Sequence, residues 1–311
     1  MKEFDEFLEY FMAKHRCLKT SERKVAEHLT TYFKDVAPDK IELITKKMKE
    51  TGFMFAETSG GGFKSYYGIV AFPFQKARTV AFHEIGHLID FISLEEVRTL
   101  IGRSGWKTKY IEHAYSKEIV LSSSKTLSDI VKNEAEAKST EICEFLVKRF
   151  QEEVLDYVGK DLAEEYLLSG KKNIEMDRAK KNYSHNKNKE SIEAKLALEK
   201  YDEINKFLKE NEYFNRPRKM MHKTPEYNRF VDKYNVLLDV LSGCTDECKY
   251  IFPGHSRSYF KSIGFGVEFF AEIFCAEALN NDDCINATKL FLPESLKAYR
   301  ELYSSIKAKT L

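Results

Sequence analysis

The stretch that decides the fold is TVAFHEIGHLID, residues 79–90, in which the pattern His-Glu-x-x-His lies inside an apolar run. Residues four apart share one face of a helix, so His83 and His87 can bind one metal ion through their imidazoles. Glu84 follows the first histidine and can reach a water molecule on that ion. Two nitrogen ligands, a general base and an open coordination position are what a zinc hydrolase requires.

The residues around this motif predict a buried helix over 76–93. Its flanks are apolar, as in a helix that packs on both sides rather than facing solvent. Gly86 stands between the two histidines, where a helix would favour alanine by roughly 1 kcal/mol. We interpret this glycine as a sign that another backbone, or the ion itself, comes close to the helix there.

A third metal ligand is expected far downstream, in the apolar stretch VEFFAEIF at residues 267–274. Glu268 and Glu272 are four positions apart and share one face of the predicted helix. One of them can bind the metal while the other orients a ligand histidine. Acidic side chains in so apolar a run require a partner, which favours this interpretation over two ordinary helix glutamates.

The motif HEIGHLID, followed much later by EFFAE, resembles the gluzincin metallopeptidases, most closely the catalytic-domain type of anthrax lethal factor. Together with LSG at 241–243 and GHSRSY at 254–259, EFFAE also resembles the zincin-like C-terminal domain of phage minor head (head morphogenesis) proteins. Together, the two resemblances cover about 100 residues of the chain, in the ranges of roughly 60–95 and 235–285. They imply a Zn²⁺ site whose three ligands are His83, His87 and Glu268.

The same resemblance implies roles for the residues around the metal. Glu84 would be the general base acting on a zinc-bound water, and Glu272 would support a ligand histidine. In the lethal-factor type, a tyrosine a few residues before the ligand glutamate assists at the transition state. Here Tyr259 is nine residues before Glu268, and the position closer to the glutamate is occupied by Lys261, which is not aromatic. Either Tyr259 or His255 is therefore expected to fill this role.

A substrate-binding strand is predicted just before the metal helix. Residues 63–72 are rich in aromatic and β-branched side chains, follow the turn Gly60-Gly61-Gly62, and end before a proline. In metallopeptidases of this type, a strand beside the metal helix lies along the substrate. An exposed edge can pair with an extended peptide through backbone hydrogen bonds. We expect Tyr67, Ile69 and Ala71 to contact the substrate.

The fold class predicted is α+β: a mostly helical zincin-like metallopeptidase fold, with a small sheet beside the metal helix and a large helical insertion. Residues 1–50 are predicted to form an N-terminal helical segment, because apolar residues recur there at helical spacing. The catalytic domain then spans 51–311 and is interrupted by the insertion at about 95–225. Within it, the lysine-rich stretch 170–223 is predicted to be a solvated helical hairpin or a mobile insertion. The alternative is a surface for an acidic partner, including nucleic acid.

Composition narrows the classes of partner. The chain has 311 residues and a net charge of +1, so no overall field favours nucleic acid or a membrane surface. Six scattered cysteines do not form a dense disulfide framework. Neither a membrane-spanning apolar run nor the apolar core of a signal peptide is found. The expected location is the cytoplasm, with export by a non-classical route left open.

Three functions remain in competition. The first is a zinc metalloendopeptidase that acts on a polypeptide substrate. The second is a phage-derived head or assembly protein whose zinc site stabilises the fold, with phage or mobile-element assembly partners. The third is a toxin-like protease effector. The intact motif favours an enzyme, because a purely structural zinc site has no need of Glu84.

Overall fold

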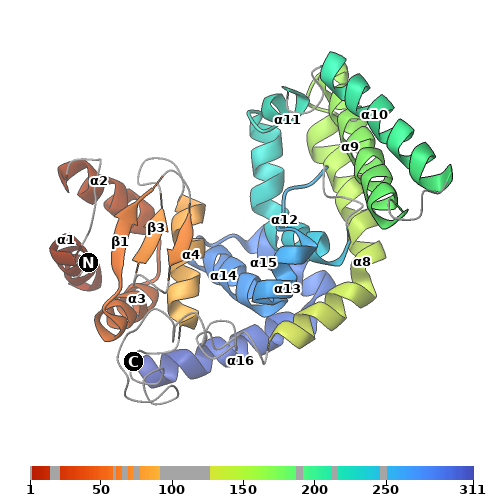
Figure 1. Cartoon of the computed structure of the whole chain (residues 1–311). Helices are drawn as coiled ribbons and strands as arrows, with labels where there is room; N and C mark the ends of the chain where they lie inside the picture. The colour runs from red at the N-terminus through yellow and green to blue at the C-terminus, as the bar shows by residue number, and fades with distance from the viewer. Residues whose placement is uncertain are drawn as a thin grey trace. The chain divides into compact units, whose positions relative to one another are not determined.

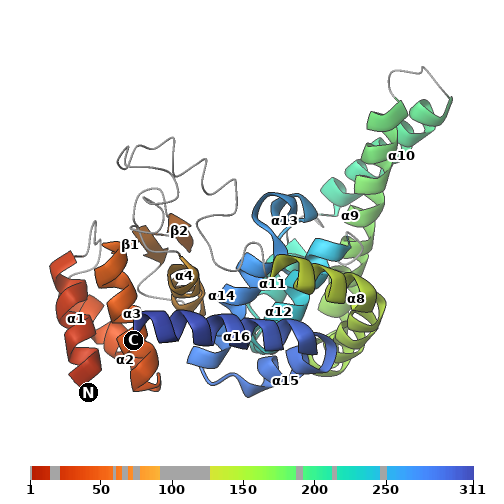
Figure 2. The same cartoon turned by 90° about the horizontal axis from the view of Figure 1, so that it is seen from below.

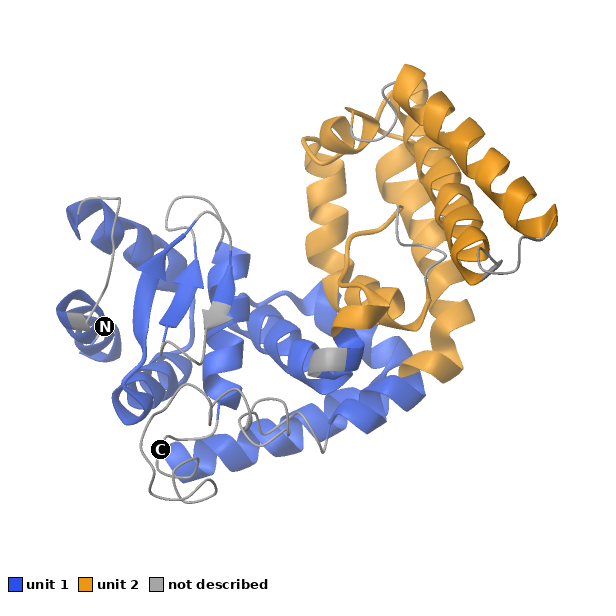
Figure 3. Ribbon diagram, in the orientation of Figure 1, with its two compact units in different colours: residues 1–134, 260–311 blue, residues 135–259 orange. Residues whose placement is uncertain are grey.

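The computed structural model describes residues 2–14, 22–58, 61–64, 69–72, 78–91, 127–186, 192–211, 216–245 and 251–311. Over these ranges the protein is mostly helical with one small β-sheet, an α+β arrangement (Figures 1 and 2). None of the described helices combines the length and the apolar character that crossing a bilayer would require. The chain divides into two compact units, Met1–Glu134 with Phe260–Leu311, and Ala135–Tyr259 (Figure 3).

The sheet of the first unit has three strands in the order β1-β3-β2. Their bounds are Met54–Glu57 for β1, Gly62–Lys64 for β2 and Ile69–Phe72 for β3. β3 runs parallel to β1 and antiparallel to β2. The central strand is therefore β3, and both of its backbone edges are paired.

This topology corrects the predicted position of the substrate-binding edge. Ile69 and Ala71 lie on the central strand, where their backbone groups already pair with β1 or β2. The side chain of Ala71 is also buried. Among the described strands, β2 pairs on one side only and offers its other edge. Tyr67, the third residue expected to contact substrate, lies outside the described residues.

Three N-terminal helices belong to the first unit, and aromatic rings of the first two pack on the sheet and on the helix at 78–90. They are α1 (Lys2–Lys14), α2 (Glu22–Phe33) and α3 (Pro38–Thr51). The ring centroid of Phe55 in β1 lies 4.9 Å from that of Phe11 and 6.2 Å from that of Phe7. Phe33 approaches Phe82 of the metal helix to 5.0 Å. The helices expected over residues 1–50 are thus part of the unit that holds the sheet.

The predicted metal helix is α4, Arg78–Asp90, and the helix that carries the distant glutamates is α14, Phe265–Ala278. α4 packs against β2 and β3 and, separately, against α14. The chain then continues through α15 (Asp282–Phe291) and α16 (Pro293–Thr310). Glu134 fixes the start of α16, because its carboxylate accepts hydrogen bonds from the backbone N–H groups of Glu294 and Ser295.

The regular secondary structure described in the second unit is all helical. α8 (Ser128–Phe150) begins in the first unit and leads through a π-helical turn, Gln151–Leu155, into the second. Four further helices follow in this unit: α9 (Lys160–Asn186), α10 (Ile192–Glu210), α11 (Arg216–Met221) and α12 (Pro225–Cys244). The short helix α13 (Arg257–Ile263) crosses the boundary back into the first unit. α9 and α10 form the helical hairpin that the lysine-rich stretch predicted.

An aromatic core explains where the second unit ends. The ring of Phe150 lies 5.2 Å from that of Phe230 in α12 and 5.5 Å from that of Phe252. These contacts place α12 and the segment after it with the inserted helices. The unit spans 135–259, whereas the insertion was expected at about 95–225. Residues 92–126 lie outside the part of the chain that the structure describes.

Three helices begin where the sequence places a proline. α3, α12 and α16 start at Pro38, Pro225 and Pro293. Proline suits the first helical turn because the amide it lacks would have no partner there. α12 is further capped by Thr224, whose hydroxyl accepts a hydrogen bond from the backbone of Tyr227.

Candidate metal centre

The candidate site lies between α4 and α14, within the first unit. Each helix presents one stripe of residues at helical spacing to the other: Thr79, His83, Gly86 and His87 from α4, and Glu268, Ala271, Glu272 and Cys275 from α14. At one end the thiol of Cys275 donates to the carbonyl oxygen of Thr79 at 3.3 Å. At the other end His87 meets Glu268. The two helices therefore run antiparallel along these stripes.

Gly86 is what lets the helices come so close. A β-carbon at this position would lie 2.7 Å from the Cα of Ala271 and 2.9 Å from its carbonyl oxygen. Both of these are backbone atoms, which cannot rotate away as the end of a side chain can. The prediction of a close backbone approach at Gly86 is confirmed. Because Ala271 is one turn from Glu268, this approach carries the glutamate to the histidines.

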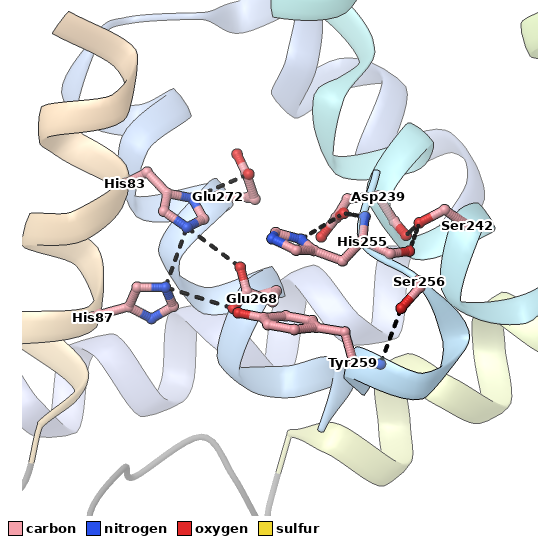
Figure 4. Close-up of polar contacts among 9 residues, drawn as sticks. All are labelled: His83, His87, Asp239, Ser242, His255, Ser256, Tyr259, Glu268 and Glu272. Carbon is pink, nitrogen blue, oxygen red and sulfur yellow. Dashed lines mark hydrogen bonds and ion pairs between the residues drawn. The ribbon is translucent and has the colours of Figure 1, made fainter. Parts of the chain in front are cut away.

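Three side chains direct their ligand atoms toward a common point (Figure 4). The Nε2 atoms of His83 and His87 are 3.1 Å apart. Glu268 places Oε2 at 3.3 Å from Nε2 of His83, and Oε1 at 3.7 Å from Nε2 of His87. The structure thus brings together the three residues that the sequence proposed as ligands.

These separations fit a tetrahedral zinc ion. At bond lengths of about 2.0–2.1 Å, two ligands of such an ion lie about 3.3 Å apart. Two imidazole nitrogens and one carboxylate oxygen are also a donor set that catalytic zinc uses, with the fourth position open. The side chain of Glu268 is only 2% exposed. A carboxylate withdrawn this far from water requires strong compensation, which a cation at this point would supply.

Glu272 supports the first histidine from behind. Its Oε1 lies 3.1 Å from Nδ1 of His83, the ring nitrogen that does not face the other candidate ligands. A carboxylate at Nδ1 holds the ring so that Nε2 presents its lone pair to a metal. Burial lowers the pKa of His83, but Glu272 and Glu268 outweigh it and raise the pKa well above its ordinary value. The same two negative charges favour a metal cation at this position.

Glu84 lies beside the ligands, buried on α4, with 8% of its surface exposed. The chain just before β2 passes directly over its carboxylate. A β-carbon built on Gly61 would overlap Oε1 of Glu84 and lie 2.6 Å from Cγ1 of Val80. Sequence reasoning treated Gly61 only as part of a flexible turn. The run of three glycines was the signal, but its meaning depends on a contact that no local pattern contains.

His255 and Tyr259, the two candidates for transition-state stabilisation, belong to the second unit. The Nδ1 atom of His255 lies 2.9 Å from Oδ1 of Asp239, and the backbone N–H of His255 donates to the same oxygen at 2.7 Å (Figure 4). The rings of His255 and Tyr259 are stacked, with centroids 4.2 Å apart. Since the ligands belong to the first unit, a role for either residue at the metal stays a prediction.

Asp239 is a functional candidate that the sequence analysis missed. It is buried on α12, and its carboxylate holds both the ring and the backbone of His255. An acid at Nδ1 fixes the tautomer of a histidine and leaves Nε2 for chemistry. The signal was an aspartate inside the apolar run LLDVL at residues 237–241. Gly254 supports this turn, with φ at +150° and no room for a β-carbon against Ser242.

No family model, curated protein or solved structure matches this chain at a significant level. A functional assignment therefore depends on the geometry and chemistry of the chain's own residues.

Proposed function

We propose that this protein is a zinc-dependent metallopeptidase of the gluzincin type, with a zincin-like fold around α4 and α14, that hydrolyses peptide bonds of a polypeptide. One observation carries the proposal: the ligand atoms of His83, His87 and Glu268 lie within 4.8 Å of one another. A buried glutamate, Glu84, follows the first ligand on the same helix. A site that served only to hold the fold together would need the three ligands but not this fourth residue.

The residues of the site divide the chemistry among themselves. When bound, zinc supplies a Lewis acid, which lowers the pKa of water toward about 7 and polarises a carbonyl group. Glu84 takes the proton from the attacking water and passes it to the leaving amine. Glu272 holds His83 in the orientation that binding requires. The burial of Glu84 and Glu268 keeps bulk water from competing for these contacts.

The open edge of β2 is the place where this chemistry would meet a substrate. An extended polypeptide can add to a strand edge through backbone hydrogen bonds. The chain entering β2 lies over Glu84, so a peptide paired with this edge would run past the general base. Backbone pairing selects for an extended, unfolded segment rather than for particular side chains. We therefore propose that the substrate is an unstructured stretch of polypeptide.

The test compares the zinc-loaded wild-type protein with Glu84→Gln on an unstructured protein substrate. Loss of a general base typically costs about 10²- to 10⁴-fold in rate. We expect a fall of this size with the zinc content unchanged, since Glu84 is not a ligand. Glu277→Gln, also on α14 but paired with Lys40 rather than with the site, is the control that should cleave normally. Equal cleavage by wild type and Glu84→Gln would contradict the proposal.

A hydrogen bond to the developing oxyanion is the part that we propose for His255 or Tyr259. His255→Ala and Tyr259→Phe, measured separately, would identify the donor by a fall in kcat with KM unchanged. If His255 is the donor, Asp239→Asn should reproduce much of its loss, because the amide no longer fixes the tautomer of the ring. If neither variant lowers kcat, the oxyanion has another donor.

A structural zinc site in a phage-derived assembly protein is the second candidate function. It is favoured by the place of Tyr259, which lies in another unit than the ligands and nine residues before Glu268. A protein that binds zinc tightly and cleaves no polypeptide would support it. A toxin-like effector would share the proposed chemistry and differ in its substrate, so a screen of polypeptide substrates separates it from a general peptidase.

A further inference from the structure

Gly61 is required at its position for space rather than for backbone freedom. Unlike Gly52 and Gly254, Gly61 has no φ in the left-handed region, so alanine there would not meet that source of strain. The atoms that a β-carbon there would meet are Oε1 and Cδ of Glu84 and Cγ1 of Val80. With only a hydrogen in place of a side chain, Gly61 leaves the space that the Glu84 carboxylate occupies.

The cost of filling this space would fall on Glu84 and not on the fold. All three atoms belong to the outer parts of side chains, which can rotate about their χ angles. At Gly86, by contrast, the obstructing atoms are backbone atoms of Ala271. Gly61 itself is exposed, so an added methyl group has solvent on its other side. Alanine at this position would thus leave the helix and sheet in place while the carboxylate moves.

We propose that Gly61 is a positioning residue, which keeps the Glu84 carboxylate at the point where it accepts the proton of the attacking water. This inference rests on the proposed peptidase function and adds a residue to it. A displaced base no longer reaches the water at hydrogen-bond distance. Misplacement of a reacting group by about 1 Å costs about 100-fold in rate. Gly61→Ala should therefore reduce turnover without releasing zinc.

The experiment uses the full-length, zinc-loaded protein and four variants. They are Gly61→Ala, Val80→Ala, the two combined, and Gly159→Ala, whose added β-carbon meets no atom within 4 Å. For Gly61→Ala we expect kcat to fall about 100-fold, with KM, bound zinc and Tm as in wild type. Val80→Ala and Gly159→Ala should behave as wild type. The combined variant should stay as slow as Gly61→Ala, because making room at Val80 leaves the overlap with Glu84.

Two results would overturn the inference: an unchanged kcat in Gly61→Ala, or recovery of kcat in the combined variant. A crystal structure of zinc-loaded Gly61→Ala gives a readout that does not need activity. We expect the Glu84 carboxylate to be displaced while the three ligand side chains stay in place, and an unmoved carboxylate refutes the role of Gly61. If wild type cleaves no polypeptide, the peptidase proposal fails, and this crystal structure still decides whether Gly61 positions Glu84.

Discussion

Each unit contains a pair of antiparallel helices, and the two pairs bury different kinds of side chain. In α4 and α14, buried polar side chains from both helices face one another, as His87 and Glu268 do. α9 and α10 also pack together, and Ala179 and Leu208 are buried there, while many of their charged side chains are exposed. Buried apolar side chains of this kind are what a helical hairpin needs in order to fold. The first pair brings buried polar groups of two helices against one another, which a hairpin does not need for its stability.

The way each pair satisfies its polar groups shows the same difference. In α9, the buried amide of Asn173 donates to the carbonyl oxygen of Ser169 in its own helix, at 2.8 Å. At the candidate metal site, Glu268 and Glu272 of α14 instead face a histidine of α4. A buried polar group that hydrogen-bonds within its own helix contributes only to stability. Polar groups that pair between two helices bring titratable side chains to one point, and such clusters often mark functional sites.

Glu268→Gln is expected to have the largest effect and to show that the first pair is a metal site. Mutation of residues that merely support a zinc ligand costs 10–100-fold in affinity, so loss of a ligand should exceed about 100-fold. Competition with a chromophoric chelator measures this loss. Glu277→Gln on the same helix is the matched control and should keep wild-type affinity. If both variants bind zinc equally well, Glu268 is not a ligand and the comparison breaks.

Gly86→Ala should have the next largest effect, on the free energy of unfolding. The added methyl group meets the backbone of Ala271, and overpacking of this kind costs about 1–3 kcal/mol. Better helix propensity returns roughly 1 kcal/mol at most. We expect net destabilisation in urea, together with weaker zinc binding as Glu268 moves away. Gly159→Ala has open space and should be neutral. A Gly86→Ala protein with wild-type stability would show that the helices are not in close contact.

Leu196→Ser on α10 should have the smallest effect and sharpens the other side of the comparison. This leucine is 59% exposed, so its loss removes little buried apolar area. Surface substitutions of this kind usually change the free energy of unfolding by less than about 0.5 kcal/mol. Urea denaturation and the zinc titration should both match wild type. A loss of more than about 1 kcal/mol would mean that this surface of α10 is packed rather than solvated.

The sequence predicted much of the site because its clues are local. The spacing of His83 and His87 follows from one helical turn, and the apolar run around Glu268 and Glu272 announces a second buried helix. Gly86 gave a clue to contact between helices, since a glycine there costs helix stability. The starts of α3, α12 and α16 depend on proline in the same local way.

The predictions that missed concern partners distant in the chain. The central position of β3 depends on its pairing with β1 and β2, which strand periodicity does not contain. The N-terminal helices join the sheet because Phe7 and Phe11 reach Phe55. The roles of Gly61 and Asp239 likewise emerge only where two segments meet.

By itself, then, the sequence determined a mostly helical chain with a His-Glu-x-x-His helix and two glutamates that need a partner. Helical period and composition are enough for this, because each residue's neighbours within a turn are known. Only the tertiary structure decided that His83, His87 and Glu268 converge, that β2 has an unpaired edge among the described strands, and that Gly61 lies against Glu84. These facts depend on packing between segments, where a close approach is set by the shapes of both partners.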